Sequence, residues 1–318
     1  MHQQSAFLLI VVAVSTATMA HGQLAASTPA TRFWEQALPG TTMPEVIADF
    51  VQKGIDQSPL VEHYSAHPSI SMCTLFNTIC DPQMVAETGI YFHEAQLHPG
   101  STMTLSFPAE VEIPILPHNV ADKVPFENLS DVLATFHITP GSAEAAQVED
   151  TLSKCQEPPL AGEAKACTTS LESIVQTAME MLGTTTTQLQ GGGGGDYVWA
   201  ATSALPRGGL LPRRQYVVQT VTPLVGSRYV SCHKVPFPYA VYQCHVTNRG
   251  YKAYMVSLSG RHEGPMVSLL AFCHFDTSCW NPMHPAFQIL NTHPGGSTPV
   301  CHFMSYGNLA FVKKAGTA

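Results

Sequence analysis

The chain has 318 residues, of which 45% are hydrophobic and only 12% are charged. This composition supplies enough apolar side chains for a packed core and is not typical of a disordered protein. The 15 Lys and Arg residues against 23 Asp and Glu residues give a formal net charge of -8. Binding to a polyanion needs clustered basic side chains, so we expect no nucleic-acid partner.

The N-terminus has the pattern of a secretory signal peptide. The apolar run AFLLIVVAV, residues 6–14, is too short to span a bilayer, and small residues follow it up to Ala20. Residues 1–22 are therefore predicted to be removed, with cleavage after Ala20 or Gly22, although the usual basic residue at the start is missing. We expect a secreted protein of the extracellular space or cell wall, without a membrane anchor.

The next part of the chain, residues 23–89, is expected to be a leader and linker. Its polar, proline-containing stretch at residues 54–74 is interpreted as the linker. After it, the sequence GIYFHEAQLHPGSTMTLSF, residues 89–107, has two strand-like runs around Pro99 and Gly100. This pattern predicts a β-hairpin.

Two helices are predicted before the C-terminal half. Residues 142–155 have apolar side chains at helical spacing after Ser142, and residues 169–182 open with Thr169 or Ser170 as the cap. A loop is expected between Cys155 and Cys167. Five consecutive glycines then lie within an insertion at residues 188–200, which we expect to be a surface loop.

From residue 214 onward the sequence is dominated by short runs of β-branched and aromatic residues separated by turn residues. We interpret AFQILNTHP, residues 286–294, as one of these strands. The predicted fold class is α+β, β-rich, with an antiparallel or mixed sheet built from the C-terminal strands and two or three helices before it.

Nine cysteines in a secreted chain are expected to oxidise for the most part, and the odd number leaves one outside any disulfide. Cys155 and Cys167 are expected to pair, because the eleven residues between them include Pro158, Pro159 and Gly162 and can return the chain. The sequon Asn128-Leu129-Ser130 is a candidate N-glycosylation site.

The strongest pattern is a Cys-His dipeptide that occurs four times. Ten, twenty-seven and twenty-six residues separate the successive pairs, which are Cys232-His233, Cys244-His245, Cys273-His274 and Cys301-His302. No cysteine lies two to four residues from another, so the spacing is not that of a zinc finger or zinc ribbon. The four cysteines are expected to form two bridges, with three possible connectivities.

Neighbouring residues on a strand point to opposite faces, so each dipeptide separates its thiol from its imidazole. If the four strands are neighbours in one sheet, the sulfurs meet on one face and the imidazoles of His233, His245, His274 and His302 meet on the other. Four imidazoles favour copper or nickel, with copper first in the affinity series, while ligand type leaves zinc open. The alternative is that the histidines are partly exposed sheet residues and only the disulfides matter.

The same spacing resembles the pattern that defines the plant BURP domain family. Other strings are similar to that family as well: FPYAVYQCHVT at 237–247, CHFDTSCWNPMHPAFQIL at 273–290, and the stretch at 92–107. The resemblance covers residues 90–313, which we take as the BURP domain. FWEQALPGTTMP, at 33–44, is similar to a region that often precedes the domain.

The resemblance implies a protein of the plant apoplast or cell wall, and it places metal ligands at the histidines of the four dipeptides. His284 also matches a histidine of the family pattern and is a second candidate for a ligand or base, while His98 is expected to be a turn residue. Cys73 and Cys80 lie in a poorly matching segment, and their pairing leaves Cys279 outside the disulfides.

Some members of the family are copper-dependent peptide cyclases that crosslink a Tyr or Trp side chain of their own chain. No Gln-Pro-initiated core peptide lies between the cleavage site and Phe33, and GDYVWAA at 195–201 is the alternative candidate, which otherwise forms the edge of a strand. We therefore expect a noncatalytic secreted protein of the cell wall, acting in development or stress, with a wall polysaccharide or wall protein as partner. The alternatives are a copper-dependent cyclase and a storage or scaffold protein without metal.

Overall fold

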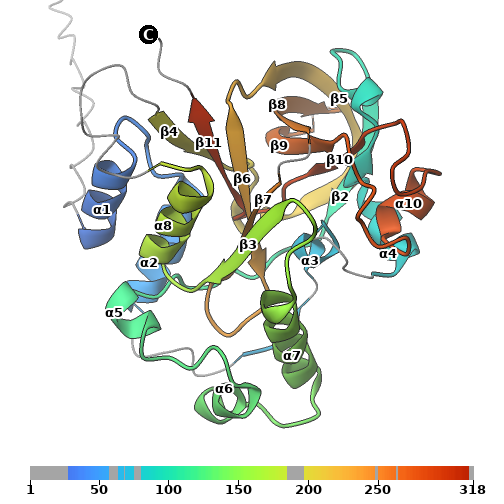
Figure 1. Cartoon of the computed structure of the whole chain (residues 1–318). Coiled ribbons are helices and arrows are strands. Elements are labelled where there is room, and N and C mark those ends of the chain that lie inside the picture. Colours follow the sequence, from blue (N-terminus) through green and yellow to red (C-terminus); the bar gives the residue numbers. More distant parts are fainter. Residues whose placement is uncertain are drawn as a thin grey trace, which may run out of the picture.

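A computed structural model describes residues 28–56, 64–67, 69–74, 80–184, 197–247, 250–262 and 264–314. The predicted signal peptide and the glycine run lie outside these residues. The fold is α+β, as predicted, and its strands form two antiparallel sheets rather than one (Figure 1).

The first sheet has six strands in the order β1-β10-β9-β8-β5-β2. Their bounds are β1 Tyr91–Phe92, β2 Thr102–Phe107, β5 Leu211–Pro223, β8 Tyr251–Gly260, β9 Met266–His274 and β10 Val300–Phe303. The second sheet has five strands in the order β3-β7-β6-β11-β4. Their bounds are β3 Glu163–Thr168, β4 Tyr197–Ala201, β6 Arg228–Val235, β7 Val241–Thr247 and β11 Leu309–Lys314.

Helices cover the outer faces of both sheets. Their bounds are α1 Pro29–Ala37, α2 Glu45–Asp56, α3 Ile70–Thr74, α4 Pro82–Thr88, α5 His118–Ala121, α6 Leu129–Thr135, α7 Ala143–Gln156, α8 Leu171–Met181 and α10 Pro285–Ile289. In Figure 1, α1, α2 and α8 lie beside the five-stranded sheet, and α4 and α10 lie on the far side of the six-stranded sheet. More helices are thus present among the described residues than the two or three expected.

The two sheets pack face to face through apolar side chains. Leu270 and Phe272 of β9 lie in one buried cluster with Ala310 and Val312 of β11. Because side chains alternate along a strand, the next residues on β9 and β11 face outward, into the cores beneath the covering helices. Every CH-bearing strand thus has one face toward the other sheet and one toward a helical layer.

Both predicted helices of the central region are confirmed at their caps. Ser142 caps α7 by accepting a hydrogen bond from the Ala145 amide, and Ser170 caps α8 in the same way through the Ser173 amide. These caps satisfy amide groups that have no partner inside the helix, which explains why the serines mark the helix starts. Cys167, however, lies on strand β3 rather than in a loop.

The predicted hairpin at residues 89–107 is wrong. Strand β1 pairs with β10, and β2 pairs with β5, so the two runs lie at opposite edges of the six-stranded sheet. A short 3-10 turn, Glu94–Gln96, and the turn at Pro99 and Gly100 lie between them. Long-range pairing at each edge therefore prevails over the local turn signal.

Two further interpretations need correction. Residues 286–294 do not form a strand, because His284 caps a helix and Pro285 occupies its first turn, a position that suits proline, which gives α10. The stretch at 54–74, interpreted as a linker, contains α3, all of whose residues are buried. Its apolar side chains Ile70 and Cys73 belong to the core beneath the six-stranded sheet.

The cross-strand disulfide of the six-stranded sheet should make a large contribution to stability. Cys273 and Cys301 are 28 residues apart in sequence, and in the chain-entropy model such a link contributes about 3–4 kcal/mol. We expect the double variant Cys273→Ala/Cys301→Ala to lose about that much unfolding free energy in urea titrations. Cys279→Ala, which breaks no disulfide, is the control and should change it by less than about 1 kcal/mol. Equal losses in both variants would contradict this account.

Candidate functional site: a buried histidine cluster between the sheets

Two cross-strand disulfides lie at the centre of the molecule. Cys232 of β6 is directly opposite Cys244 of β7, and Cys273 of β9 is directly opposite Cys301 of β10. Both pairs are bonded, and in each the Cα atoms are 3.9 Å apart. Of the three connectivities that the sequence allowed, the structure therefore has the one that joins neighbouring strands, with one bridge in each sheet.

The cysteines face the outer cores, so the histidine that follows each cysteine faces the space between the sheets. This side contains four imidazoles, two from each sheet. We call this set the histidine cluster; its members are His233, His245, His274 and His302. The sequence argument assumed one sheet, but two sheets facing one another bring the imidazoles together equally well.

Within each sheet the two imidazoles stack. The ring centroids of His233 and His245 are 5.3 Å apart, and those of His274 and His302 are also 5.3 Å apart. The sheets meet where His233 approaches His302, with centroids 6.0 Å apart. Nε2 of His274 and Nε2 of His302 lie 3.2 Å apart, at hydrogen-bond distance.

The cluster is almost completely removed from solvent, with exposed fractions of 1%, 6%, 6% and 2% in chain order. Burial, assisted by the neighbouring histidines, holds the pKa of His233 and of His274 well below the ordinary value. Burial also lowers the pKa of His302, to about 4, although its contact with the Phe303 carbonyl acts in the opposite direction. These three imidazoles are therefore neutral at neutral pH, the form that binds metal ions.

Two polar side chains from other elements reach the cluster. Glu163 of β3 places Oε1 3.0 Å from Nδ1 of His245, with both side chains buried, at ion-pair distance but without the alignment of a hydrogen bond. Thr74 of α3 places Oγ1 3.4 Å from Nδ1 of His233. Sequence reasoning missed both residues, because their position depends on the pairing of β3 with β7 and on the packing of α3 against β6.

Aromatic side chains line the side of the cluster that belongs to the six-stranded sheet. The ring of Trp280 is 5.0 Å from that of His274 and 4.8 Å from that of His284. The ring centroid of Tyr91 is 6.3 Å from that of His302 and 5.6 Å from that of His284. The Tyr91 hydroxyl donates a hydrogen bond to the Cys73 carbonyl. His284 thus borders the cluster through Trp280 and Tyr91, and its Nδ1 accepts from an amide of α10.

The histidine cluster can be compared with the requirements of a metal site. His233 Nε2 is buried without a hydrogen-bond partner among the described residues. The 3.2 Å between the Nε2 atoms of His274 and His302 suits two ligands that share one ion at about 2.0–2.1 Å. In the described part of the chain, however, no group of three or more His, Cys, Asp or Glu side chains is arranged to hold a metal ion. The type of donor atom, the burial and the distance between one pair of nitrogens thus suit a metal ion. The stacked rings, however, do not surround a common point.

The remaining candidate residues lie elsewhere. Cys155 pairs with Cys167, and Cys73 with Cys80, while Cys279 takes part in no disulfide. His98 is exposed in its turn and lies outside the cluster. These positions therefore add no ligand to the histidine cluster.

Asn128 is exposed and caps α6 through its Oδ1, which accepts hydrogen bonds from the amides of Ser130 and Asp131. Tyr197–Ala201, part of the alternative substrate candidate, forms the edge strand β4. Asp196 and the preceding glycines lie outside the described residues.

Each sheet contains one cross-strand disulfide, and the two sheets share a buried histidine cluster. Comparison with known proteins identifies the family with this architecture. The BURP domain model matches residues 90–313. Protein RAFTIN 1A of Triticum aestivum is 42% identical over 231 residues, covering 71% of this chain and 56% of the relative. The chain belongs to the BURP domain family.

Two rice proteins extend the match beyond the domain. BURP domain-containing protein 13 of Oryza sativa subsp. japonica is 40% identical over 272 residues, which cover 83% of this chain and 63% of the relative. BURP domain-containing protein 5 of the same organism is 34% identical over 303 residues, which cover 91% and 88%. The chain thus covers less than two thirds of RAFTIN 1A and of BURP domain-containing protein 13 but most of BURP domain-containing protein 5.

The buried imidazoles predict acid sensitivity of the metal-free protein. The folded pKa values of His233, His274 and His302 lie below the unfolded value of about 6.5, so the unfolded chain binds more protons at pH values between the folded and the unfolded pKa. The free energy of unfolding is therefore highest above about pH 6.5 and decreases as the pH falls toward 4. Protonation of His302 alone accounts for about 3 kcal/mol of this decrease. Urea unfolding of chelator-treated protein at a series of pH values measures this loss.

The variants His302→Gln and His98→Gln separate this effect from general acid denaturation. His302→Gln should make the unfolding free energy less dependent on pH, because the variant lacks one buried titrating group. His98→Gln removes an exposed histidine and should leave the slope unchanged. A slope that is the same in all three proteins would show that the cluster does not control the acid response.

Proposed function

We propose that this BURP protein is secreted to the cell wall, acts there in development or stress without catalytic activity of its own, and holds one copper ion at its histidine cluster. The observation that carries the proposal is the burial of four imidazoles, two from each sheet. Three of these imidazoles are neutral at neutral pH. Burying so many imidazoles next to one another is costly unless their nitrogens find a partner.

Copper is the metal that best suits this donor set. Imidazole nitrogen is a borderline ligand, and divalent copper has the highest affinity in the first-row series for such sites. A copper ion bound by side chains of both sheets would join β6 and β7 to β9 and β10, which no disulfide does. The proposed role of the metal is therefore to lock the two sheets together.

Secretion is supported by the use of cysteine. Four disulfides join eight of the nine cysteines, a pattern of oxidising compartments. No helix in the described residues is long and apolar enough to cross a membrane. The exposed Asn128 uses its Oδ1 as a helix cap and is a candidate for N-glycosylation in the secretory pathway.

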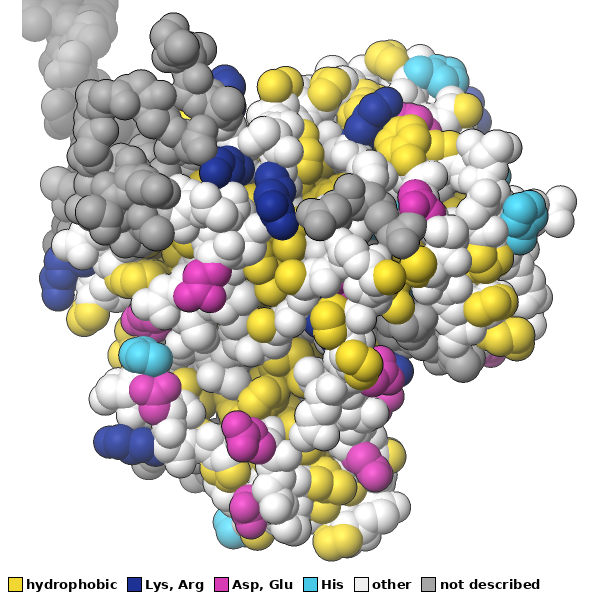
Figure 2. Space-filling view, in the orientation of Figure 1, with side chains coloured by type: hydrophobic (Ala, Val, Ile, Leu, Met, Phe, Trp, Pro, Cys, Tyr) yellow, Lys and Arg dark blue, Asp and Glu magenta, His cyan; other side chains and the backbone are white. Residues whose placement is uncertain are grey.

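A wall polysaccharide or wall protein is the proposed partner. The chain has few charged residues, and Figure 2 shows isolated Lys, Arg, Asp and Glu side chains among polar and apolar surface on this face. Such a surface suits a weakly charged partner better than a polyanion, which needs clustered basic side chains.

Loss of one imidazole should weaken copper binding without unfolding the sheets. We expect wild-type protein to bind one equivalent of Cu(II), and His245→Ala to bind it at least about tenfold more weakly, since each lost ligand removes one coordination bond. Isothermal titration of metal-free protein, with metal content by mass spectrometry, measures the affinity. Both proteins should melt cooperatively, because the disulfides on the outer faces remain.

His98→Ala is the matched control, since it removes an exposed histidine outside the cluster. Its copper affinity should equal that of the wild type. If wild-type protein binds no copper, or if His98→Ala weakens binding as much as His245→Ala does, the shared site is refuted and a storage or scaffold role without metal is favoured.

Glu163 should assist the site through His245. A carboxylate 3.0 Å from Nδ1 favours a proton on that nitrogen, which places the metal-binding lone pair of His245 on Nε2. Glu163→Gln is expected to weaken copper binding by about tenfold while the melt remains cooperative. Nitrogen chemical shifts of His245 in the metal-free protein give the proton position directly, and an unchanged shift in the variant would contradict this role.

A copper-dependent peptide cyclase is the second candidate, because Trp280 and Tyr91 contact members of the cluster. Crosslinking a Tyr or Trp side chain of the same chain would remove two hydrogens, with dioxygen as the oxidant. Incubation with Cu(II) in air, followed by peptide mass spectrometry, tests it. Unchanged peptide masses, the result expected for the noncatalytic role, would eliminate this candidate.

A further inference from the structure

A cavity between four helices lies outside the histidine cluster. The cavity has a volume of about 430 Å³ and is lined by residues of α1, α2, α5 and α8 and of the segment that leads into α5. This volume lies within the range typical of small-molecule sites. None of the lining residues belongs to the histidine cluster.

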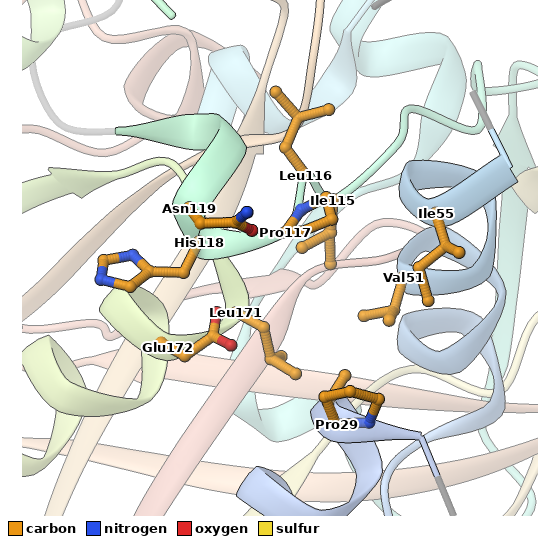
Figure 3. A pocket seen from close by; sticks show the side chains of 11 residues that line it. Pro29, Val51, Ile55, Ile115, Leu116, Pro117, His118, Asn119, Leu171 and Glu172 are labelled. Atoms are coloured by element: carbon orange, nitrogen blue, oxygen red, sulfur yellow. The ribbon is translucent and has the colours of Figure 1, made fainter. Parts of the chain in front are cut away.

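The cavity has apolar walls. Val51 and Ile55 of α2 form one side, and Ile115, Leu116 and Leu171 lie between them and the polar end (Figure 3). Val51, Ile115, Leu116 and Leu171 are buried, whereas Ile55 is 41% exposed at the edge. The backbone of residue 115 can approach α2 closely because residue 54 is glycine, and a Cβ there would overlap the Ile115 carbonyl oxygen.

The opposite end of the cavity is polar. Figure 3 shows His118, Asn119 and Glu172 at the end of the cavity opposite α2, with the imidazole of His118 directed away from the other two side chains. Nδ1 of His118 lies 3.3 Å from Oδ1 of Asp122 and 3.4 Å from Oγ of Ser170.

Glu172 supplies the only formal charge among the lining side chains when His118 is neutral. Its carboxylate makes no hydrogen bond or ion pair with the described residues, and no Lys or Arg lines the cavity. The polar end therefore offers two hydrogen-bond acceptors, the Glu172 carboxylate and the Asn119 carbonyl oxygen.

We propose that this cavity binds a small amphipathic organic cation, with the apolar body against α2 and an ammonium group at the Glu172 end. An ammonium donates hydrogen bonds to the carboxylate and to the Asn119 carbonyl oxygen, and its charge complements the carboxylate. A carboxylate ligand would face Glu172 with like charge, and a neutral alcohol would forgo the charge-assisted bond. The cavity takes no residue from the copper site, so the two proposals are independent.

Three probes that share an aromatic body and differ in the head group test the proposal. They are phenethylammonium, phenethyl alcohol and phenylpropionate, titrated at pH 7 into the metal-free full chain with affinity measured by calorimetry. We expect the ammonium to bind at least about tenfold more tightly than the alcohol, because one charge-assisted hydrogen bond contributes about that ratio in affinity. The carboxylate should bind most weakly. Amide chemical-shift changes should map to residues of α2, α5 and α8.

Two variants separate the cavity walls from its polar end. Ala30→Phe places a larger side chain into the cavity from α1 and should abolish binding of the ammonium and the alcohol alike. Glu172→Gln should bring the ammonium affinity down to that of the alcohol while the alcohol affinity stays the same. Met266→Ser, which removes an apolar side chain that is 71% exposed elsewhere, is the control for nonspecific apolar binding and should change neither affinity.

Thermal melts show whether each variant is folded. The proposal is overturned if wild-type protein binds the ammonium and the alcohol with equal affinity. It is also overturned if the chemical-shift changes fall outside the lining elements, or if folded Ala30→Phe binds the ammonium as tightly as the wild type does. Because the titrations use metal-free protein, failure of copper binding does not affect them.

Discussion

The alternation of side chains along a strand is the constraint on which the centre of this molecule depends. A cross-strand disulfide requires two cysteines directly opposite one another, and Cys232 with Cys244 and Cys273 with Cys301 meet that requirement. Once the sulfurs are joined on the outer face, the next residue on each strand must face inward. Repeating the arrangement in two facing sheets gives four imidazoles in one dry space, and the dipeptide Cys-His is the shortest sequence that can encode it.

The dry space has a thermodynamic consequence that links the fold to its chemistry. Water is excluded by the packing of Leu270 and Phe272 against β11 and by α3, which covers His233 with Thr74. A protonated imidazole is costly there, so His233, His274 and His302 are held neutral. The same burial that makes the metal-free protein sensitive to acid thus prepares the cluster for a cation. The cavity around Glu172 in the helical layer is separate, and the ligand proposed there is an ammonium group close to solvent.

Local signals in the sequence predicted much of the fold. The caps Ser142 and Ser170 gave two helices, and the Cys-His spacing indicated disulfides and a meeting of imidazoles. The wrong predictions arose where distant segments decide the structure. Strands β1 and β2 lie on either side of the turn at Pro99 and Gly100 but pair with β10 and β5, which the sequence does not mark. The division into two sheets, and the approach of Glu163 through the pairing of β3 with β7, likewise depend on pairing between distant strands. The proline in the first turn of α10 was a local signal for a helix, and the apolar run after it obscured that signal.

The central claim is that imidazoles from both sheets bind the same copper ion. X-ray absorption spectroscopy of the copper-loaded protein measures it most directly, because the fine structure gives the type, number and distance of the ligands. The account predicts four imidazole nitrogens at about 2.0 Å and the multiple-scattering pattern of histidine rings. A shell dominated by oxygen or sulfur, or no more than two imidazoles, would contradict it, since two could come from a single sheet.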